Sequence, residues 1–156
     1  MFFRPLLCLV ALIIAGCTSM KPEAFAGREP KLVLEDYFVG QSRAWGIFED
    51  RFGNLRSQFS VDIVGYMEDG ELVLEEDFLF DTGDTDRRVW RIKRTGENTY
   101  EGRANDVHGV AEGKAFGNAL TWNYVVDLDM GTRTVAVRFT DWMFLQDDGV
   151  LINRAN

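Results

Sequence analysis

Apolar and polar residues alternate with a period of two along most of the chain. Leu72, Leu74, Phe78 and Phe80 show this alternation, as does every second residue from Leu120 to Leu128. Such a period places successive side chains on opposite faces of a β-strand. The pattern predicts nine strands, at residues 41–51, 55–67, 71–80, 86–95, 98–105, 108–116, 118–128, 132–145 and 149–153.

Short turns such as Gly53-Asn54, Asp69-Gly70 and Gly117-Asn118 separate these strands, and a brief helical turn is expected at Leu32 to Phe38. Short connections favour an antiparallel up-and-down meander, because sequential strands then pair. With no helix to cover an edge, the all-β sheet is expected to close into a barrel, and a two-sheet sandwich is the alternative. A membrane barrel is disfavoured, because charged strands leave no apolar band for lipid.

The N-terminal segment has the pattern of an export signal. Arg4 precedes an apolar run from Leu6 to Ala15, which at about ten residues is too short to span a bilayer. Ile14-Ala15-Gly16-Cys17 then matches the bacterial lipobox. The sequence therefore predicts that residues 1–16 are a cleaved signal peptide and that Cys17 carries acyl chains such as palmitate, which anchor the protein to a membrane. An ordinary secretory signal that contains a cysteine is the alternative.

The residues after the lipobox indicate location and domain organisation. Thr18 stands where an Asp would favour the inner membrane, so an outer-membrane anchor facing the periplasm is expected. Residues 17–31 contain two prolines and little periodicity, and are predicted to be the lipidated N-terminus and a spacer. Residues 32–156 have the length of a single domain with its own core.

Charge and cysteine content exclude some partners and crosslinks. The net charge is -8, and loss of Arg4 with the signal changes it to -9, which argues against nucleic acid and anionic lipid surfaces as electrostatic partners. Cys8 leaves with the signal and Cys17 is acylated, so no disulfide is expected within the mature chain. The sequence does not specify an oligomeric state.

Catalytic patterns are scarce. His108 is the only histidine and is expected at a surface turn, and neither a serine elbow nor a paired-histidine metal motif occurs. Glu75, Glu76 and Asp77 are consecutive on a strand, so they alternate faces and are interpreted as a solvated surface. No catalytic residue, metal site or cofactor is therefore expected.

Two aromatic segments, residues 40–53 and 139–145, contain the candidate polar residues. Asp141 lies among apolar neighbours and needs a partner, for which Arg51 and Arg154 are the candidates, and Asp50 is a further polar candidate. Aromatic and apolar side chains on the strands are candidates for the barrel interior. They are Trp45, Phe59, Val61, Phe78, Trp90, Trp122, Tyr124 and Trp142.

Several motifs resemble a bacterial lipoprotein family, the domain of unknown function 3833. Besides the lipobox, they are Tyr37-Phe38-Val39-Gly40, the run Ala44 to Gly53, the run Gly113 to Ala119, Asp141-Trp142-Met143 and Ile152-Asn153-Arg154-Ala155. The resemblance implies a calycin-like (lipocalin-like) barrel, a connection with lipids and no assignable catalytic role. It also implies a further strand after the Asn-Arg-Ala motif, so a barrel made from this chain is expected to be open or completed by another subunit.

The leading hypothesis is a tethered, non-enzymatic barrel that binds a small apolar molecule such as a fatty acid or lipid fragment. An apolar cavity with a few polar groups at its floor would favour it. A filled barrel would favour an envelope scaffold. Carboxylates with raised pKa values open to solvent would favour a lipid-modifying enzyme that uses Asp50, Arg51 and Asp141.

Overall fold

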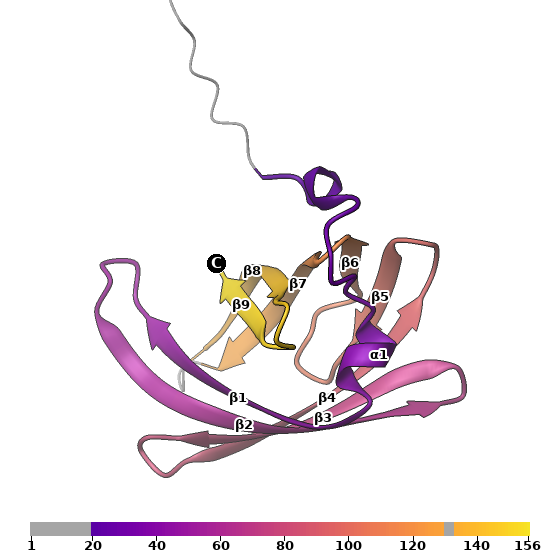
Figure 1. The fold of residues 1–156 in the computed structure, drawn as a ribbon. Coiled ribbons are helices and arrows are strands. Elements are labelled where there is room, and N and C mark those ends of the chain that lie inside the picture. Colours follow the sequence, from indigo (N-terminus) through magenta and orange to yellow (C-terminus); the bar gives the residue numbers. More distant parts are fainter. Residues whose placement is uncertain (1–19, 130–132) are drawn as a thin grey trace, which may run out of the picture.

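The computed structural model describes residues 20–129 and 133–156, and these contain nine strands in one antiparallel sheet (Figure 1). The predicted signal peptide, Cys17 and the first residue of the predicted strand 132–145 lie outside the described residues. Each strand pairs with the next one in sequence, which confirms the all-β meander. The strands are β1 (Gly40–Glu49), β2 (Leu55–Glu68), β3 (Glu71–Phe80), β4 (Thr85–Arg94), β5 (Thr99–Arg103), β6 (Ala111–Phe116), β7 (Ala119–Asp129), β8 (Thr134–Leu145) and β9 (Leu151–Ala155).

The sheet curls into a half-barrel. It turns through 303°, which brings the two edge strands β1 and β9 toward each other without pairing them in the described part of the chain (Figure 1). The interior is therefore open along the side between these two strands, and the fold is compatible with a calycin-like barrel.

One end of the half-barrel is filled and covered. Leu72 and Leu120 are almost completely buried on the inner face, and helix α1 (Leu34–Phe38) lies across this end with Leu34 buried beneath it. The helix approaches β2 closely, because a Cβ at Gly65 would lie 1.9 Å from the carbonyl oxygen of Phe38. The predicted helical turn is thus present, and it closes the barrel at this end.

Trp122 occupies the centre of the filled end. Its indole lies over two backbone positions without side chains, since a Cβ at Gly102 would be 2.4 Å from the ring and one at Gly113 would be 2.3 Å from it. Trp90 contacts it edge-on with ring centroids 5.7 Å apart. Gly102 and Gly113 therefore leave the space on β5 and β6 that the Trp122 indole occupies.

The segment before α1 packs against the outside of the barrel. The 3-10 helix η1 (Pro22–Phe25) places the ring of Phe25 at 5.9 Å from Trp142 and 5.5 Å from Phe144. The backbone N–H of Leu32 donates to the carbonyl of Gly117 at 2.8 Å. Residues 22–31, predicted as a spacer, are therefore docked on the domain, because an apolar stripe on the outer face of β8 needs cover. Within the described ranges, neither helix is long and apolar enough to span a bilayer.

Candidate functional site

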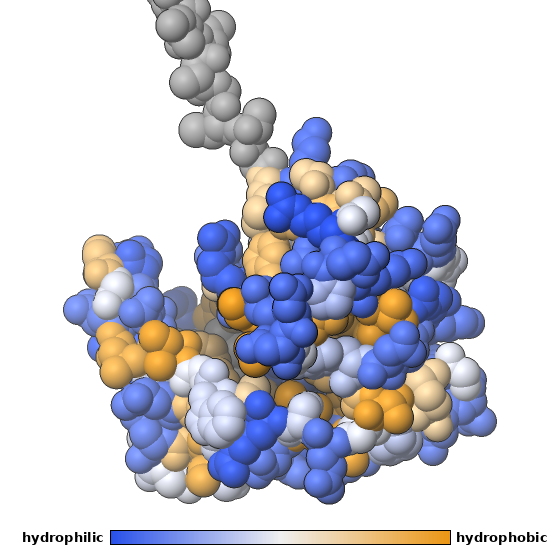
Figure 2. Space-filling view, in the orientation of Figure 1, coloured by the Kyte–Doolittle hydropathy of each residue, from blue (hydrophilic) through white to orange (hydrophobic). Residues whose placement is uncertain are grey.

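The uncovered end of the half-barrel has an aromatic inner face. The aromatic row, which we define as Phe48, Phe59, Phe78 and Phe80, runs across β1, β2 and β3. Phe59 is the centre of the row, with ring centroids 4.8 Å from Phe48, 5.8 Å from Phe78 and 6.0 Å from Phe80. All four rings keep some solvent exposure although they point inward, so they line an unfilled end. Figure 2 shows the molecule hollowed here, between the β1–β2 hairpin and the rest of the domain.

A second aromatic surface lies on β7 and β8. Tyr124 and Phe139 are cross-strand partners whose rings stack with centroids 5.6 Å apart, and both are half-buried on the inner face. Trp90 contacts the edge of Tyr124 at 5.5 Å. Tyr124 therefore lies where the filled end meets the open end.

Charged side chains are half-buried at the same boundary. Glu76 of β3 and Arg88 of β4 are directly opposite each other and share the inner face with Phe78. The Nε of Arg88 donates to both carboxylate oxygens of Asp106 at 3.1 and 3.0 Å, and the guanidinium carbon lies 5.8 Å from the centroid of Phe78. Arg88 thus joins the aromatic row to an ion pair, in which the fork of the guanidinium is already engaged by one carboxylate.

Asp141 contributes a third carboxylate from β8. Only 5% of the residue is exposed, and its Oδ2 accepts a hydrogen bond from the Tyr124 hydroxyl at 3.1 Å. Its Oδ1 is buried and accepts no hydrogen bond from the described part of the chain. We call Glu76, Arg88, Asp106, Tyr124 and Asp141 the interior polar cluster.

Burial changes the proton affinity of this cluster. Loss of solvation raises the pKa of Glu76 to about 7, against the opposing effect of Arg88 and with smaller contributions from Asp106 and Asp141. Burial also raises the pKa of Asp141, although the side chains of Tyr124 and Asn153, and to a smaller extent the charge of Arg88, favour its ionised form. A carboxyl group with a pKa near 7 exchanges its proton around neutral pH, so the charge of the interior depends on pH.

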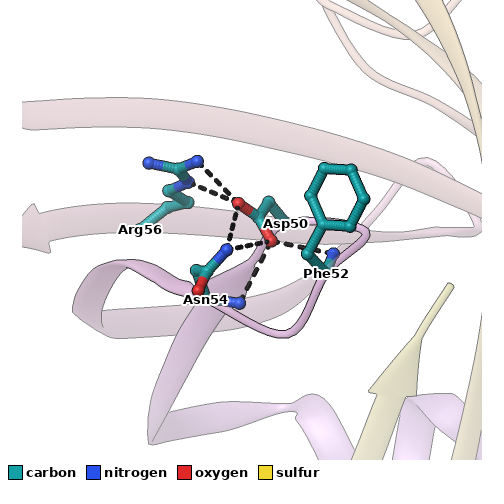
Figure 3. Close-up of polar contacts among 4 residues, drawn as sticks. All are labelled: Asp50, Phe52, Asn54 and Arg56. Atoms are coloured by element: carbon teal, nitrogen blue, oxygen red, sulfur yellow. Dashed lines mark hydrogen bonds and ion pairs between the residues drawn. The ribbon is translucent and has the colours of Figure 1, made fainter.

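Asp50, a predicted polar candidate, has a structural role in the β1–β2 turn (Figure 3). Its Oδ1 accepts hydrogen bonds from the backbone N–H of Phe52 at 2.8 Å and of Asn54 at 3.0 Å, and its Oδ2 accepts from Arg56 Nε at 3.0 Å. The side-chain and backbone hydrogen bonds from Asn54 are the main cause that lowers the pKa of Asp50 to about 2. Arg51 lies over the ring of Phe52 at 4.7 Å. This turn therefore organises the hairpin and is not part of the interior polar cluster.

The predicted charge pairs of Asp141 are wrong. Its side-chain partner is the Tyr124 hydroxyl, and Arg51 is held at the β1–β2 turn. Arg154 is opposite Trp142 on the outward-facing side of β9. The alternation of β8 and β9 places Asp141 and Arg154 on opposite faces of the sheet, so they cannot pair.

The predicted interior set is correct for most residues and wrong for two. Six lie on the inner face: Phe59, Val61, Phe78, Trp90, Trp122 and Tyr124. Trp45 is on the outer face, opposite Ser60, and is 75% exposed. Trp142 also points outward, because it neighbours the inward-facing Asp141, and it is buried under Phe25 of η1.

Glu76, Arg88 and Asp106 were not predicted as site residues. The expectation that Glu75 to Asp77 form a solvated face holds for Glu75 and Asp77, which pair with Arg87 at 2.7 and 3.1 Å. It is wrong for Glu76, which has the same parity as Leu72, Leu74, Phe78 and Phe80 on β3 and so points inward. The position of Glu76 in the alternation of β3 is therefore the feature of the sequence that could have identified it as an interior residue. His108, expected on the surface, is exposed and lies 3.6 Å from Asp127.

These features define the chain as an antiparallel half-barrel with one filled end, one open aromatic end and a charged boundary between them. The model of a family described as protein of unknown function (DUF3833) matches residues 11–156. Because the match covers nearly the whole chain, the protein belongs to this family. Searches of curated proteins and of solved structures found no match.

Proposed function

We propose that this protein is a lipid-anchored envelope lipoprotein whose half-barrel binds a small apolar ligand, such as a fatty acid or lipid fragment. The observation that carries the proposal is the aromatic row, which faces the interior, is left uncovered at the open end and leads to the interior polar cluster. Concave apolar surfaces with a few polar groups at their floor are typical of small-molecule sites.

An apolar ligand would cover the aromatic side chains that are exposed at the open end. Phe59 and Phe78 are half-buried and keep part of their surface open to solvent in the described structure, so a chain lying along them removes apolar surface from water. Each Å² of such surface contributes about 25 cal/mol, and each buried methylene about 0.8 kcal/mol. The affinity for a ligand is therefore expected to rise with its chain length.

Binding is better supported than catalysis by the same residues. The Arg88 guanidinium already holds Asp106, and the Tyr124 hydroxyl already donates to Asp141 Oδ2, so these groups are engaged by partners within the protein and are not set up to act on a reacting bond. Asp50 and Arg51, the other residues proposed for an enzyme, belong to the hairpin turn. The cluster is placed at the floor of an apolar surface, as expected for a group that orients a ligand.

The chain-length dependence tests the binding proposal. The mature chain from residue 18, which contains every strand and the whole described core, is titrated by calorimetry with fatty acids of graded length below their micelle concentrations. We expect saturable binding that strengthens with length, and stabilisation of about 2.7 kcal/mol at a hundredfold excess over the Kd. Phe59→Ala should weaken binding, while Ile47→Ala on the exposed outer face should not. Absence of binding by the whole series, and by alcohols and amines of the same chain lengths, would favour the scaffold hypothesis.

The membrane anchor is tested separately. The lipobox and the short apolar run support acylation of Cys17, and several acyl chains on one residue give a stable anchor. Cys17→Ala should abolish incorporation of a radioactive fatty acid and leave unprocessed or soluble protein. Ser19→Ala, two residues further on, is the matched control and should be labelled like the wild type. Equal labelling of the Cys17→Ala protein would contradict lipidation at this position.

A further inference from the structure

The interior polar cluster has an excess of negative groups. Three carboxylates share the boundary of the open end with the guanidinium of Arg88: Glu76 is directly opposite Arg88, Asp106 accepts from it, and Asp141 accepts from Tyr124. The Nε of Arg88 is shared between the two oxygens of Asp106, and its Nη2 also donates to Asp106. A second anion that entered this site would meet two further carboxylates and a cation already neutralised by its partner.

Asp141 supplies an acceptor, Oδ1, that no donor meets at hydrogen-bond geometry within the described residues, although the Asn153 side chain on β9 lies near enough to favour the ionised carboxylate. Only 5% of Asp141 is exposed to solvent. Its Oδ1 accepts no hydrogen bond within the described residues. Tyr124 cannot serve both oxygens, because its single hydroxyl proton is directed to Oδ2 at 3.1 Å. A buried acceptor without a donor is destabilising, so a ligand group that donates a hydrogen bond here recovers free energy.

We propose that the half-barrel selects apolar ligands whose head group donates hydrogen bonds and is neutral or positively charged, such as a long-chain alcohol or amine, over those with an ionised carboxylate. This inference rests on the proposed function, since it names the class of ligand for the same site. The chain lies along the aromatic row, and the head group lies at Glu76, Tyr124 and Asp141. An ionised fatty acid is disfavoured here by like charge, and its protonated form, which has a donor, is accepted.

The experiment compares three ligands that share one chain. The mature chain is titrated by calorimetry at pH 8 with dodecylamine, dodecan-1-ol and dodecanoate. We expect the amine and the alcohol to bind at least about tenfold more tightly than dodecanoate, a ratio that corresponds to 1.4 kcal/mol. Equal affinities, or tightest binding of dodecanoate, would overturn the head-group inference and leave the proposed function intact. Failure of all three to bind would instead overturn the proposed function.

Variants of the interior polar cluster test whether it causes the head-group preference. Asp141→Asn keeps the shape of the side chain and removes its charge, so it should reduce the advantage of dodecylamine over dodecanoate by about tenfold. Asp77→Asn on the outer face of β3 is the control and should retain the wild-type ratio. Should Asp141→Asn fail to fold, Glu76→Gln provides the same test from the facing strand. An unchanged ratio in the folded cluster variant would overturn the assignment.

Discussion

Trp122→Ala is expected to lower the free energy of unfolding by about 3–5 kcal/mol, the range for removal of a large aromatic side chain from a core. The indole is 4% exposed and rests on Gly102 and Gly113, which have no side chains to fill the space it leaves. Because neighbouring groups cannot readily fill this cavity, we expect the loss of stability to lie in the upper part of that range. Trp90, which meets the indole edge-on, also loses this contact.

Urea denaturation followed by circular dichroism measures this change. Trp45→Ala is the matched control, because Trp45 is 75% exposed on the outer face and should change stability by no more than about 0.5 kcal/mol. Trp122→Phe should be intermediate, since a smaller ring still covers the two glycines. Similar losses for Trp122→Ala and Trp45→Ala would contradict the placement of the two indoles on opposite faces.

The nine strands could be predicted because each depends on local alternation and each turn on local residues. The face that a strand presents to the interior depends on its neighbours. On β1 the inward positions are mostly small, and a Cβ at Gly46 would lie 2.4 Å from the ring of Phe59. Phe59 occupies the inner face beside Gly46, and the neighbouring Trp45 of β1 lies on the outer face. Hydrophobicity alone therefore misplaced Trp45.

The site was only partly predictable for a related reason. The inward position of Glu76 follows from its parity with the apolar residues of β3, but a single charge on an apolar face has no meaning until its partners are known. Arg88 is its neighbour across one pair of strands, whereas Asp141 reaches it only because the sheet curls through 303°. The sequence shows which side chains alternate along each strand but not how far the sheet curls. The proximity of the three carboxylates could therefore not be predicted from it.

Trp142 shows how cover from outside the sheet changes the interpretation of a strand. Asp141 and Trp142 are both buried, although adjacent residues of a strand face opposite sides. The interior covers Asp141, and Phe25 of η1 covers Trp142. A segment as short as η1 shows no hydrophobic periodicity. The docking of residues 22–31 on the domain could therefore not be predicted from the pattern of apolar and polar residues.

The last prediction concerns stability against pH and follows from Glu76. Its pKa is about 7 in the folded protein and 4.5 at its ordinary value, so the folded state holds the proton more tightly. The contribution of this group to stability is complete below about pH 4.5 and is lost as pH rises through about 7. Asp141, whose pKa is also raised by burial, acts in the same direction. Wild-type stability should therefore fall from pH 5 to pH 8, opposite to ordinary acid denaturation.

Glu76→Gln tests this prediction, because it keeps the volume of the side chain and removes its titration. A shift of this size corresponds to about 2–3 kcal/mol after allowance for partial solvent access to Glu76. At pH 8 the variant should be more stable than the wild type by about this amount, and the two should converge toward pH 5. The low pKa of Asp50 affects stability only below about pH 4, outside this window. Glu75→Gln, on the outer face of the same strand, is the control and should keep the wild-type slope. Parallel stability curves for the wild type and Glu76→Gln from pH 5 to pH 8 would show that Glu76 titrates as it does in water, and would remove it from the interior.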